Sequence, residues 1–212
     1  MLNFNRHSDS FNSLDIGKIS LIKEWLDNMN VINYLINEDH TIDVDGDVDL
    51  SHKGLTTFPS FITFRSVTGS FTCNHNKLKS LKGCPYKVGV SFYCNDNLLK
   101  NLDHGPSFVG SSYIAHGNNL ISLKGIAETV NSFSCNDNLL KSLKHLPRVI
   151  YGDLYCNENL LNNLSYIPRN IKGNLYIDFK GRDYSITDIR KVCYVEELIY
   201  MGDKVNCKEP NI

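Results

Sequence analysis

One eleven-residue phrase occurs five times in this sequence at nearly constant spacing. The copies are FTCNHNKLKSL, FYCNDNLLKNL, YIAHGNNLISL, FSCNDNLLKSL and LYCNENLLNNL, which begin at residues 71, 92, 113, 133 and 154. Consecutive copies therefore start 20 or 21 residues apart, and weaker copies begin at residues 48 and 175. A short tandem repeat of this kind predicts a solenoid, because a single unit can bury its apolar side chains only against its neighbours.

Each unit carries the same pattern of apolar and polar positions. If the first aromatic or aliphatic residue is position 0, apolar residues fall at 0, +2, +7 and +10. The alternation around positions 0 and +2 predicts a short strand with one buried face. Position +5 is occupied by Asn76, Asn97, Asn118, Asn138 and Asn159. We expect these asparagines to point inward and to hydrogen-bond the backbone of their own and the next unit.

The pattern resembles the leucine-rich repeat, whose consensus is L-x-L-x-x-N-x-L-x-x-L, over about residues 42 to 200. The resemblance implies an α/β repeat solenoid of about seven to eight parallel strands, whose sheet lines the concave side. Units this short leave room only for extended or 3₁₀ return segments. Returns with PxxV at Pro85, LPxxI at Pro147 and the related IPxxI at Pro168 are similar to those of bacterial effector repeat proteins. They resemble even more those of the small leucine-rich-repeat proteins encoded by phages.

We expect a single domain, 1–212, with a cap at each end of the repeats. The N-terminal cap is predicted at 13–47, the repeats at 48–180 and the C-terminal cap at 181–203. Apolar residues at three- and four-residue spacing predict an amphipathic helix that covers the first repeat; they are Ile19, Ile22, Trp25, Leu26 and Met29. The alternating segment 41–50 predicts a hairpin that turns near Asp45 and Gly46.

The C-terminal cap is predicted to contain a short helix followed by a strand. The segment 185–195 begins with the capping-box pattern Ser185-x-x-Asp188, although Thr187 is an alternative cap residue. The strand is expected in LIYMG, at 198–202, which is a last, weak copy of the repeat.

The cysteines and histidines could suggest a metal site, but their positions favour another interpretation. Cys73, Cys94, Cys135 and Cys156 share position +2 with Ala115 and Ile177. An aliphatic residue in the same position favours core packing, and free buried cysteines indicate a reducing, cytoplasmic compartment. That compartment would be a bacterial host's if the protein is phage-encoded. His52 and His75 at +4 lie near carboxylates such as Asp96, but we interpret this column as a solvated rim.

The composition and the motifs limit the possible functions. The formal net charge is -1, and no apolar run approaches the roughly 20 residues of a membrane span. These properties disfavour a membrane protein and a basic nucleic-acid binder. The sequence contains no G-x-S-x-G, H-E-x-x-H or phosphate-binding loop motif. We therefore expect no enzyme activity, no cofactor and no metal site.

Positions -1, +1 and +3 of the strands are left free by the repeat pattern and carry no Lys or Arg. We predict that a protein partner binds this concave face at Tyr93, Ile114, His116, Tyr155, Tyr176, Asn95 and Asn157, because tyrosine suits protein-binding surfaces. The alternative is that these tyrosines cover strand backbone and that the asparagines form turns. Lysines collect after the asparagine turn, where they form either a solvated edge or a contact for RNA or an acidic partner; they are Lys77, Lys79, Lys82, Lys100, Lys124, Lys141 and Lys144.

The predicted function is a non-catalytic protein–protein interaction module. The resemblance to phage proteins suggests a target among host or defence proteins. The alternatives are a structural or accessory virion protein, and an RNA or DNA binder that uses the lysine edge. Neither a membrane nor a nucleic acid is the expected partner.

Overall fold

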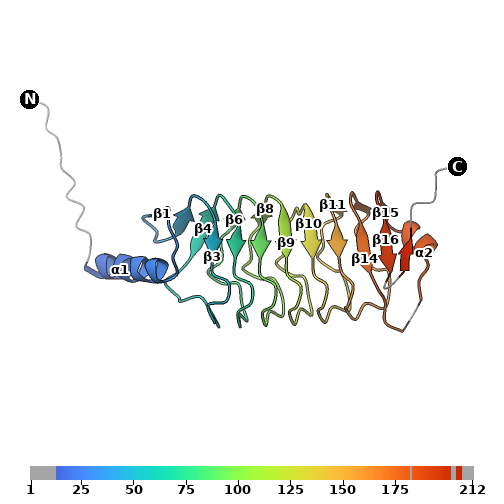
Figure 1. Cartoon of the computed structure of the whole chain (residues 1–212), viewed down its shortest axis with the longest axis horizontal. Coiled ribbons are helices and arrows are strands. Elements are labelled where there is room, and N and C mark those ends of the chain that lie inside the picture. The colour runs from blue at the N-terminus through green and yellow to red at the C-terminus, as the bar shows by residue number, and fades with distance from the viewer. Residues whose placement is uncertain (1–12, 182, 202–203, 207–212) are drawn as a thin grey trace, which may run out of the picture.

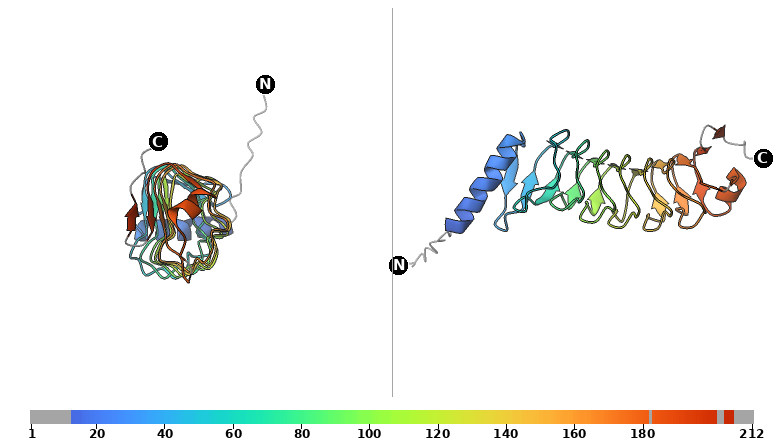
Figure 2. Two further views of the ribbon diagram at one scale, coloured as in Figure 1. Left: turned by 90° about the vertical axis from the view of Figure 1, so that its right-hand side faces the viewer. Right: turned by 90° about the horizontal axis from the view of Figure 1, so that it is seen from below.

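Short parallel strands from successive units stack along the length of the molecule, with α1 at one end and α2 at the other (Figure 1). Viewed along this axis, the coils superpose in one outline (Figure 2). The structure is a computed structural model that describes residues 13–181, 183–201 and 204–206. The outer parts of the predicted domain 1–212 lie outside these residues.

The main sheet has nine strands and runs the whole length of the array. Its strands are β3 (Val48–Asp49), β5 (Phe71–Thr72), β7 (Phe92–Tyr93), β9 (Ser112–Ile114), β10 (Ser132–Ser134), β12 (Leu154–Tyr155), β14 (Leu175–Ile177), β16 (Ile199–Met201) and β17 (Lys204–Asn206). The first eight are parallel, which confirms the predicted solenoid, and β17 pairs antiparallel with β16.

A second set of strands precedes the main sheet in most units. Five form one sheet, β1 (Tyr34–Ile36), β2 (Ile42–Val44), β4 (Phe64–Val67), β6 (Lys87–Val88) and β8 (Phe108–Val109). Three form another, β11 (Val149–Ile150), β13 (Asn170–Ile171) and β15 (Tyr194–Val195). The return segments are thus partly extended, and their apolar residues at -4 are buried: Val67, Val88, Val109, Ile150 and Ile171.

The second set is interrupted between β8 and β11, where the described segment 126–131 forms no strand. This segment belongs to the unit that begins at 113, which has 20 residues instead of 21, and the missing residue falls in its return. The interruption leaves a groove of about 360 Å³ between Phe108 and Tyr151.

The predicted hairpin at Asp45–Gly46 is wrong. Strand β2 pairs antiparallel with β1 and parallel with β4, whereas β3 pairs with β5 in the main sheet. The chain therefore turns a corner from one sheet to the other at Gly46, which has φ of 123°. The Gly46 N–H donates to Thr68 Oγ1 of the next unit at 2.8 Å. Alternating apolar residues continue through such a corner as they would through a hairpin.

Helix α1 (Ser13–Asn28) covers the N-terminal end of the array, as predicted (Figure 1). Ile22 and Leu26 are fully buried. The Trp25 ring centroid lies 6.4 Å from those of Phe58 and Phe64. The helix therefore shields the first repeat from water, which an open solenoid end requires.

Helix α2 (Ile186–Arg190) begins with the predicted capping box. The Asp188 N–H donates to Ser185 Oγ at 3.2 Å, and the Ser185 N–H donates to Asp188 Oδ2 at 3.1 Å. Ser185 is thus the cap residue, and Thr187 is not. The helix buries Ile189 and leads to β15 and β16.

Position 0 forms an aromatic spine through the second to fifth units of the array, after Val48 in the first. Phe71, Phe92, Tyr113 and Phe133 are fully buried, and successive ring centroids lie 5.9, 5.0 and 5.6 Å apart. Toward the C-terminus the same position holds the buried aliphatic residues Leu154, Leu175 and Ile199.

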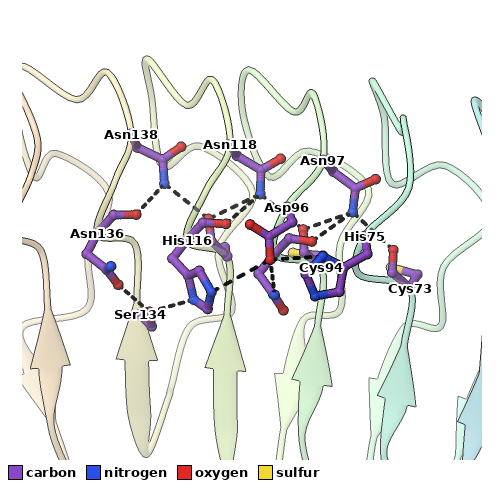
Figure 3. A network of polar contacts seen from close by, with 12 residues as sticks. Cys73, His75, Cys94, Asp96, Asn97, His116, Asn118, Ser134, Asn136 and Asn138 are labelled. Carbon is purple, nitrogen blue, oxygen red and sulfur yellow. Dashed lines mark hydrogen bonds and ion pairs between the residues drawn. The ribbon is translucent and has the colours of Figure 1, made fainter. Parts of the chain in front are cut away.

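The asparagines at +5 link each unit to its neighbour (Figure 3). Asn118 Oδ1 accepts from the Leu99 N–H at 3.0 Å, and its Nδ2 donates to the Cys94 and Ala115 carbonyls. Leu99 and Cys94 belong to the preceding unit, so the predicted bond to the next unit has the wrong direction. The inward orientation is confirmed, and these bonds satisfy backbone groups that the coil would otherwise leave bare.

Candidate functional site

One row of outward side chains crosses the main sheet at position +1. Strand register aligns Tyr93, Ile114, Ser134, Tyr155, Tyr176 and Tyr200, from β7 to β16. We call these six residues the +1 row. On either side of the row the strands bury positions 0 and +2, as Phe92 and Cys94 show. Four of the seven predicted contact residues thus lie in one line.

The C-terminal half of the +1 row is a stack of three tyrosines. The Tyr155 and Tyr176 rings lie 4.3 Å apart between centroids with an interplanar angle of 11°, and Tyr176 and Tyr200 lie 4.4 Å apart at 3°. Tyr155 donates its hydroxyl to Asp153 Oδ2 at 3.2 Å. Burial, with the nearby Asp153 carboxylate and Tyr176, raises the pKa of Tyr155. All three rings are half-buried on the outer side of the sheet.

Sequence reasoning missed Tyr200. The weak last copy of the repeat, LIY, begins at Leu198, and taking Leu198 as position 0 places the tyrosine at +2, inside the core. The structure pairs Ile199 with Leu175 and Tyr200 with Tyr176. The signal was present, since an aromatic residue with a polar tip fits the outward position better than the inward one.

The remaining predicted contacts lie at position +3. Asn95 is only 6% exposed, and its Nδ2 donates to Asp96 Oδ2 at 2.6 Å. Asn157 is half-buried and donates to Glu158 Oε1 at 3.3 Å. The His116 side chain is 36% exposed and lies beside the +1 row, with Nδ1 3.3 Å from Ser134 Oγ. His116 and Asn157 are therefore accessible at the surface, whereas Asn95 is almost covered.

Position +4 forms a rim along the turn that follows the sheet (Figure 3). His75, Asp96 and Glu158 all adopt the left-handed backbone conformation there, with φ between 51° and 55°. His75 Nδ1 lies 3.4 Å from Asp96 Oδ2, and His116 Nε2 lies 3.9 Å from the same oxygen. His52 stacks on His75 at 4.4 Å. No group of three or more potential ligands is arranged to hold a metal ion within the described residues.

The outward face of the main sheet is neutral to acidic. Among the described residues, positions -1, +1 and +3 contain no Lys or Arg. They do contain Asp47, Asp49, Asp153 and Asp178. Asp178 Oδ1 is buried and has no hydrogen-bond partner in the described part of the chain. A surface of this charge favours a neutral or cationic partner over a phosphate-rich one.

The predicted lysine edge is exposed to solvent along its length. Its members are Lys77, Lys79, Lys82, Lys100, Lys124, Lys141 and Lys144. Lys124 pairs with Asp103 of the preceding unit at 3.1 Å, and this contact partly neutralises the edge. Exposed pairs of this kind contribute little to stability, so the edge is not required by the fold.

The four cysteines at position +2 belong to the core. Cys73, Cys94, Cys135 and Cys156 are all fully buried, which confirms their predicted packing role. Burial raises the pKa of the Cys94, Cys135 and Cys156 thiols above the ordinary value. A buried protonated thiol is a poor nucleophile and a poor metal ligand.

Comparisons with known proteins add little to this geometry. No protein-family model matches the sequence, and no curated protein matches it. A solved structure described as a Shigella effector LRR domain is similar over 88% of this chain and 88% of that chain, with a TM-score of 0.46 and 14% sequence identity.

The class of the protein is defined by its own repeats. Stacked 20- and 21-residue units, a continuous parallel sheet, inward asparagines and a helix at each end make it a leucine-rich-repeat-like α/β solenoid. Solenoids of this class commonly serve as protein-interaction modules, because stacking creates an extended surface. Among the described residues, no helix is long and apolar enough to cross a membrane.

Proposed function

We propose that this protein is a non-catalytic interaction module that binds a protein partner on the outward face of the main sheet. Its centre is the +1 row, with His116 and Asn157 beside it. The observation that carries the proposal is the stack of three tyrosines outside the core. Repeat packing does not require tyrosine at this position, since Thr72 and Ser134 occupy it in other units.

The chemistry of this face suits a protein partner. Tyrosine offers a large contact area and a polar tip, and it loses little side-chain entropy on binding. Neighbouring strands hold the tyrosines in register, so the surface is ordered before a partner arrives. The lack of cations at the outward positions speaks against phosphate-rich ligands on this face.

A capture experiment from bacterial lysate tests the proposal. Wild-type protein is compared with a triple variant, Tyr93→Ala, Tyr155→Ala and Tyr176→Ala. A matched control carries Tyr86→Ala, Tyr151→Ala and Tyr194→Ala, which removes three tyrosines that are 69%, 61% and 61% exposed on other parts of the surface. Circular dichroism confirms that all three proteins are folded.

We expect wild type and the control to capture the same protein and the +1-row variant to lose it. Equal capture by all three proteins would overturn the proposal. In that case a second pair of substitutions, Lys100→Glu with Lys141→Glu, tests the lysine edge. Loss of a salt-dependent ligand in that variant would favour RNA or an acidic protein as the partner.

We further propose that this protein is phage-encoded and that its partner is a host protein or a component of host defence. The support is the resemblance of the short repeats to phage repeat proteins. The competing virion role predicts self-association or copurification with particles. Size-exclusion chromatography with light scattering tests self-association, and a monomer would favour a host target.

A further inference from the structure

The first repeat unit is two residues longer than the unit after it, and a pocket lies where the extra residues are. It begins at residue 48 and the second unit begins at 71, so it has 23 residues instead of 21. The extra residues fall in the return segment, because nine positions lead from Phe58 to Val67 whereas seven lead from Leu81 to Val88 in the second unit. Between this longer return and the turn of the second unit lies a pocket of about 380 Å³.

The pocket is formed by the packed structure itself. Phe58 and Ile62 line it and are only 7% and 2% exposed, so they make an apolar floor that belongs to the core. The Ile62 N–H donates to the Pro59 carbonyl at 2.9 Å and closes the turn of the return segment. The Phe64 N–H donates to the Gly83 carbonyl at 3.0 Å and joins this segment to the second unit. The pocket therefore needs no ligand to form, which favours binding.

The rim of the pocket carries hydroxyl groups and one cation. The residues with hydroxyl groups are all exposed, and they are Thr57, Ser60, Thr63 and Ser80. Among the described residues that line the pocket, Lys82 alone is charged. The Lys82 N–H donates to Ser80 Oγ at 3.1 Å, which fixes this hydroxyl close to the lysine. Hydroxyl and ammonium groups are donors that an anion can accept from at the same time.

The surroundings of the pocket are basic, although the whole chain has a formal net charge of -1. Residues 50–95 contain no Asp or Glu. The same residues include six cations, which are Lys53, Arg65, Lys77, Lys79, Lys82 and Lys87. Arg65 pairs with Asp43 outside this range. The pocket therefore lies in a region of positive charge, which attracts anions.

We propose that this pocket binds a small organic anion, in which a carboxylate or a phosphate monoester is attached to a compact apolar group. The apolar group lies on Phe58 and Ile62. The anionic group pairs with Lys82 and accepts hydrogen bonds from the hydroxyls of the rim. This site is separate from the +1 row and does not depend on the proposed function.

The chemistry of the pocket favours this ligand over others. A cation would meet Lys82 and would find no carboxylate among the described lining residues. An inorganic anion could use Lys82 and the hydroxyls, but it would gain nothing from the apolar floor. A volume of about 380 Å³ is near the lower end of the range for ligand pockets, so a ligand about the size of phenyl phosphate is expected.

The test titrates four probes into the ¹⁵N-labelled full chain at constant ionic strength, and backbone amide shifts are followed at Ser60, Thr63 and Lys82. Phenyl phosphate and benzoate carry both an anionic and an apolar group. Benzylamine reverses the charge, and inorganic phosphate lacks the apolar group. We expect phenyl phosphate or benzoate to bind in the millimolar range, about fivefold or more tightly than benzylamine and inorganic phosphate. The tighter of the two shows whether the site prefers a phosphate or a carboxylate.

Two substitutions locate the binding. Ser60→Phe fills the pocket from an exposed position and should weaken the binding of the preferred anion by about tenfold or more. Lys82→Gln removes the charge and should weaken it by about fivefold. The matched control is Lys144→Gln, since Lys144 is exposed and its N–H donates to Ser142 Oγ at 3.1 Å in the same local geometry. The unit that precedes Lys144 has 20 residues instead of 23, so this control should leave binding unchanged.

Three results would overturn the proposal. The first is that neither anionic probe binds more tightly than benzylamine and inorganic phosphate. The second is an equal loss of affinity in Lys82→Gln and Lys144→Gln, which would mean that anions are attracted to surface lysines in general. The third is full affinity in Ser60→Phe, which would place the binding elsewhere. Circular dichroism confirms that each variant is folded.

Discussion

The molecule contains two aromatic ladders, one on each side of the same sheet. The inner ladder is the spine of Phe71, Phe92, Tyr113 and Phe133, whose rings meet at interplanar angles from 19° to 81°. The outer ladder is the tyrosine stack, whose rings are parallel within 11°. The inner rings are fully buried, and the outer rings lie half-buried on the surface.

The difference shows which ladder the fold requires. Inner rings tilt because they must fill space among leucines from neighbouring positions, and dense packing of this kind stabilises the solenoid. Outer rings stack in parallel because only strand register positions them. In the three units that carry the outer tyrosines, position 0 of the core is aliphatic instead of aromatic, with Leu154, Leu175 and Ile199. We therefore expect folding to depend on the inner ladder more than on the outer tyrosines.

The largest expected effect separates the two ladders by their contribution to stability. Phe92→Ala opens a cavity in the spine and should lower the free energy of unfolding by about 3–5 kcal/mol. Tyr176→Ala removes a ring of similar size that contacts two neighbours in the outer ladder, and it should cost only about 1 kcal/mol. Urea unfolding followed by circular dichroism measures both. Similar losses in the two variants would contradict the division of roles.

A smaller effect is expected from the asparagines that join the units. Asn138 Oδ1 accepts from the Leu120 N–H at 2.9 Å, and its Nδ2 donates to the Ala115 and Cys135 carbonyls. Asn138→Ala leaves these buried groups without partners and should cost about 2–3 kcal/mol. The exposed Asn119 offers a control, for which Asn119→Ala should change the urea midpoint little. A mild effect at Asn138 would mean that water replaces these bonds.

The smallest effect concerns the one hydroxyl in the inner spine. Tyr113 is fully buried, and its hydroxyl has no hydrogen-bond partner among the described residues. Burial raises the pKa of Tyr113 well above its ordinary value. Tyr113→Phe removes this unsatisfied group and should stabilise the protein by about 1 kcal/mol, as thermal unfolding would show. A loss of stability would indicate that the hydroxyl has a partner.

The repeat pattern made most of the fold predictable. Side chains at positions 0 and +2 lie on one face of a strand and the side chain at +1 lies on the other. The inward direction of Phe92 and Cys94 and the outward direction of Tyr93 therefore followed from the sequence. The helix over the first repeat followed from the spacing of Ile22, Trp25 and Leu26. The buried asparagines followed from the unpaired backbone groups that each turn creates.

Other features depended on contacts that the pattern does not contain. Alternation through Gly46 is the same for a hairpin and for a corner between two sheets, so the pairing of β2 was misassigned. Tyr200 was missed because a one-residue shift in register moves a side chain to the opposite face. The network of His75, Asp96 and His116 depends on the left-handed turns at +4, which place side chains from different units together.

Site-specific photocrosslinking tests the central claim most directly. A benzoylphenylalanine replaces Tyr176 in the outer ladder. As a control it replaces Tyr194, which is 61% exposed and lies in β15 of the three-stranded sheet. Each protein is mixed with the captured partner and irradiated. If the partner binds the outer ladder, we expect a crosslinked adduct with the probe at position 176 and none with the probe at position 194. An adduct at 194 without one at 176 would show that the partner binds another face.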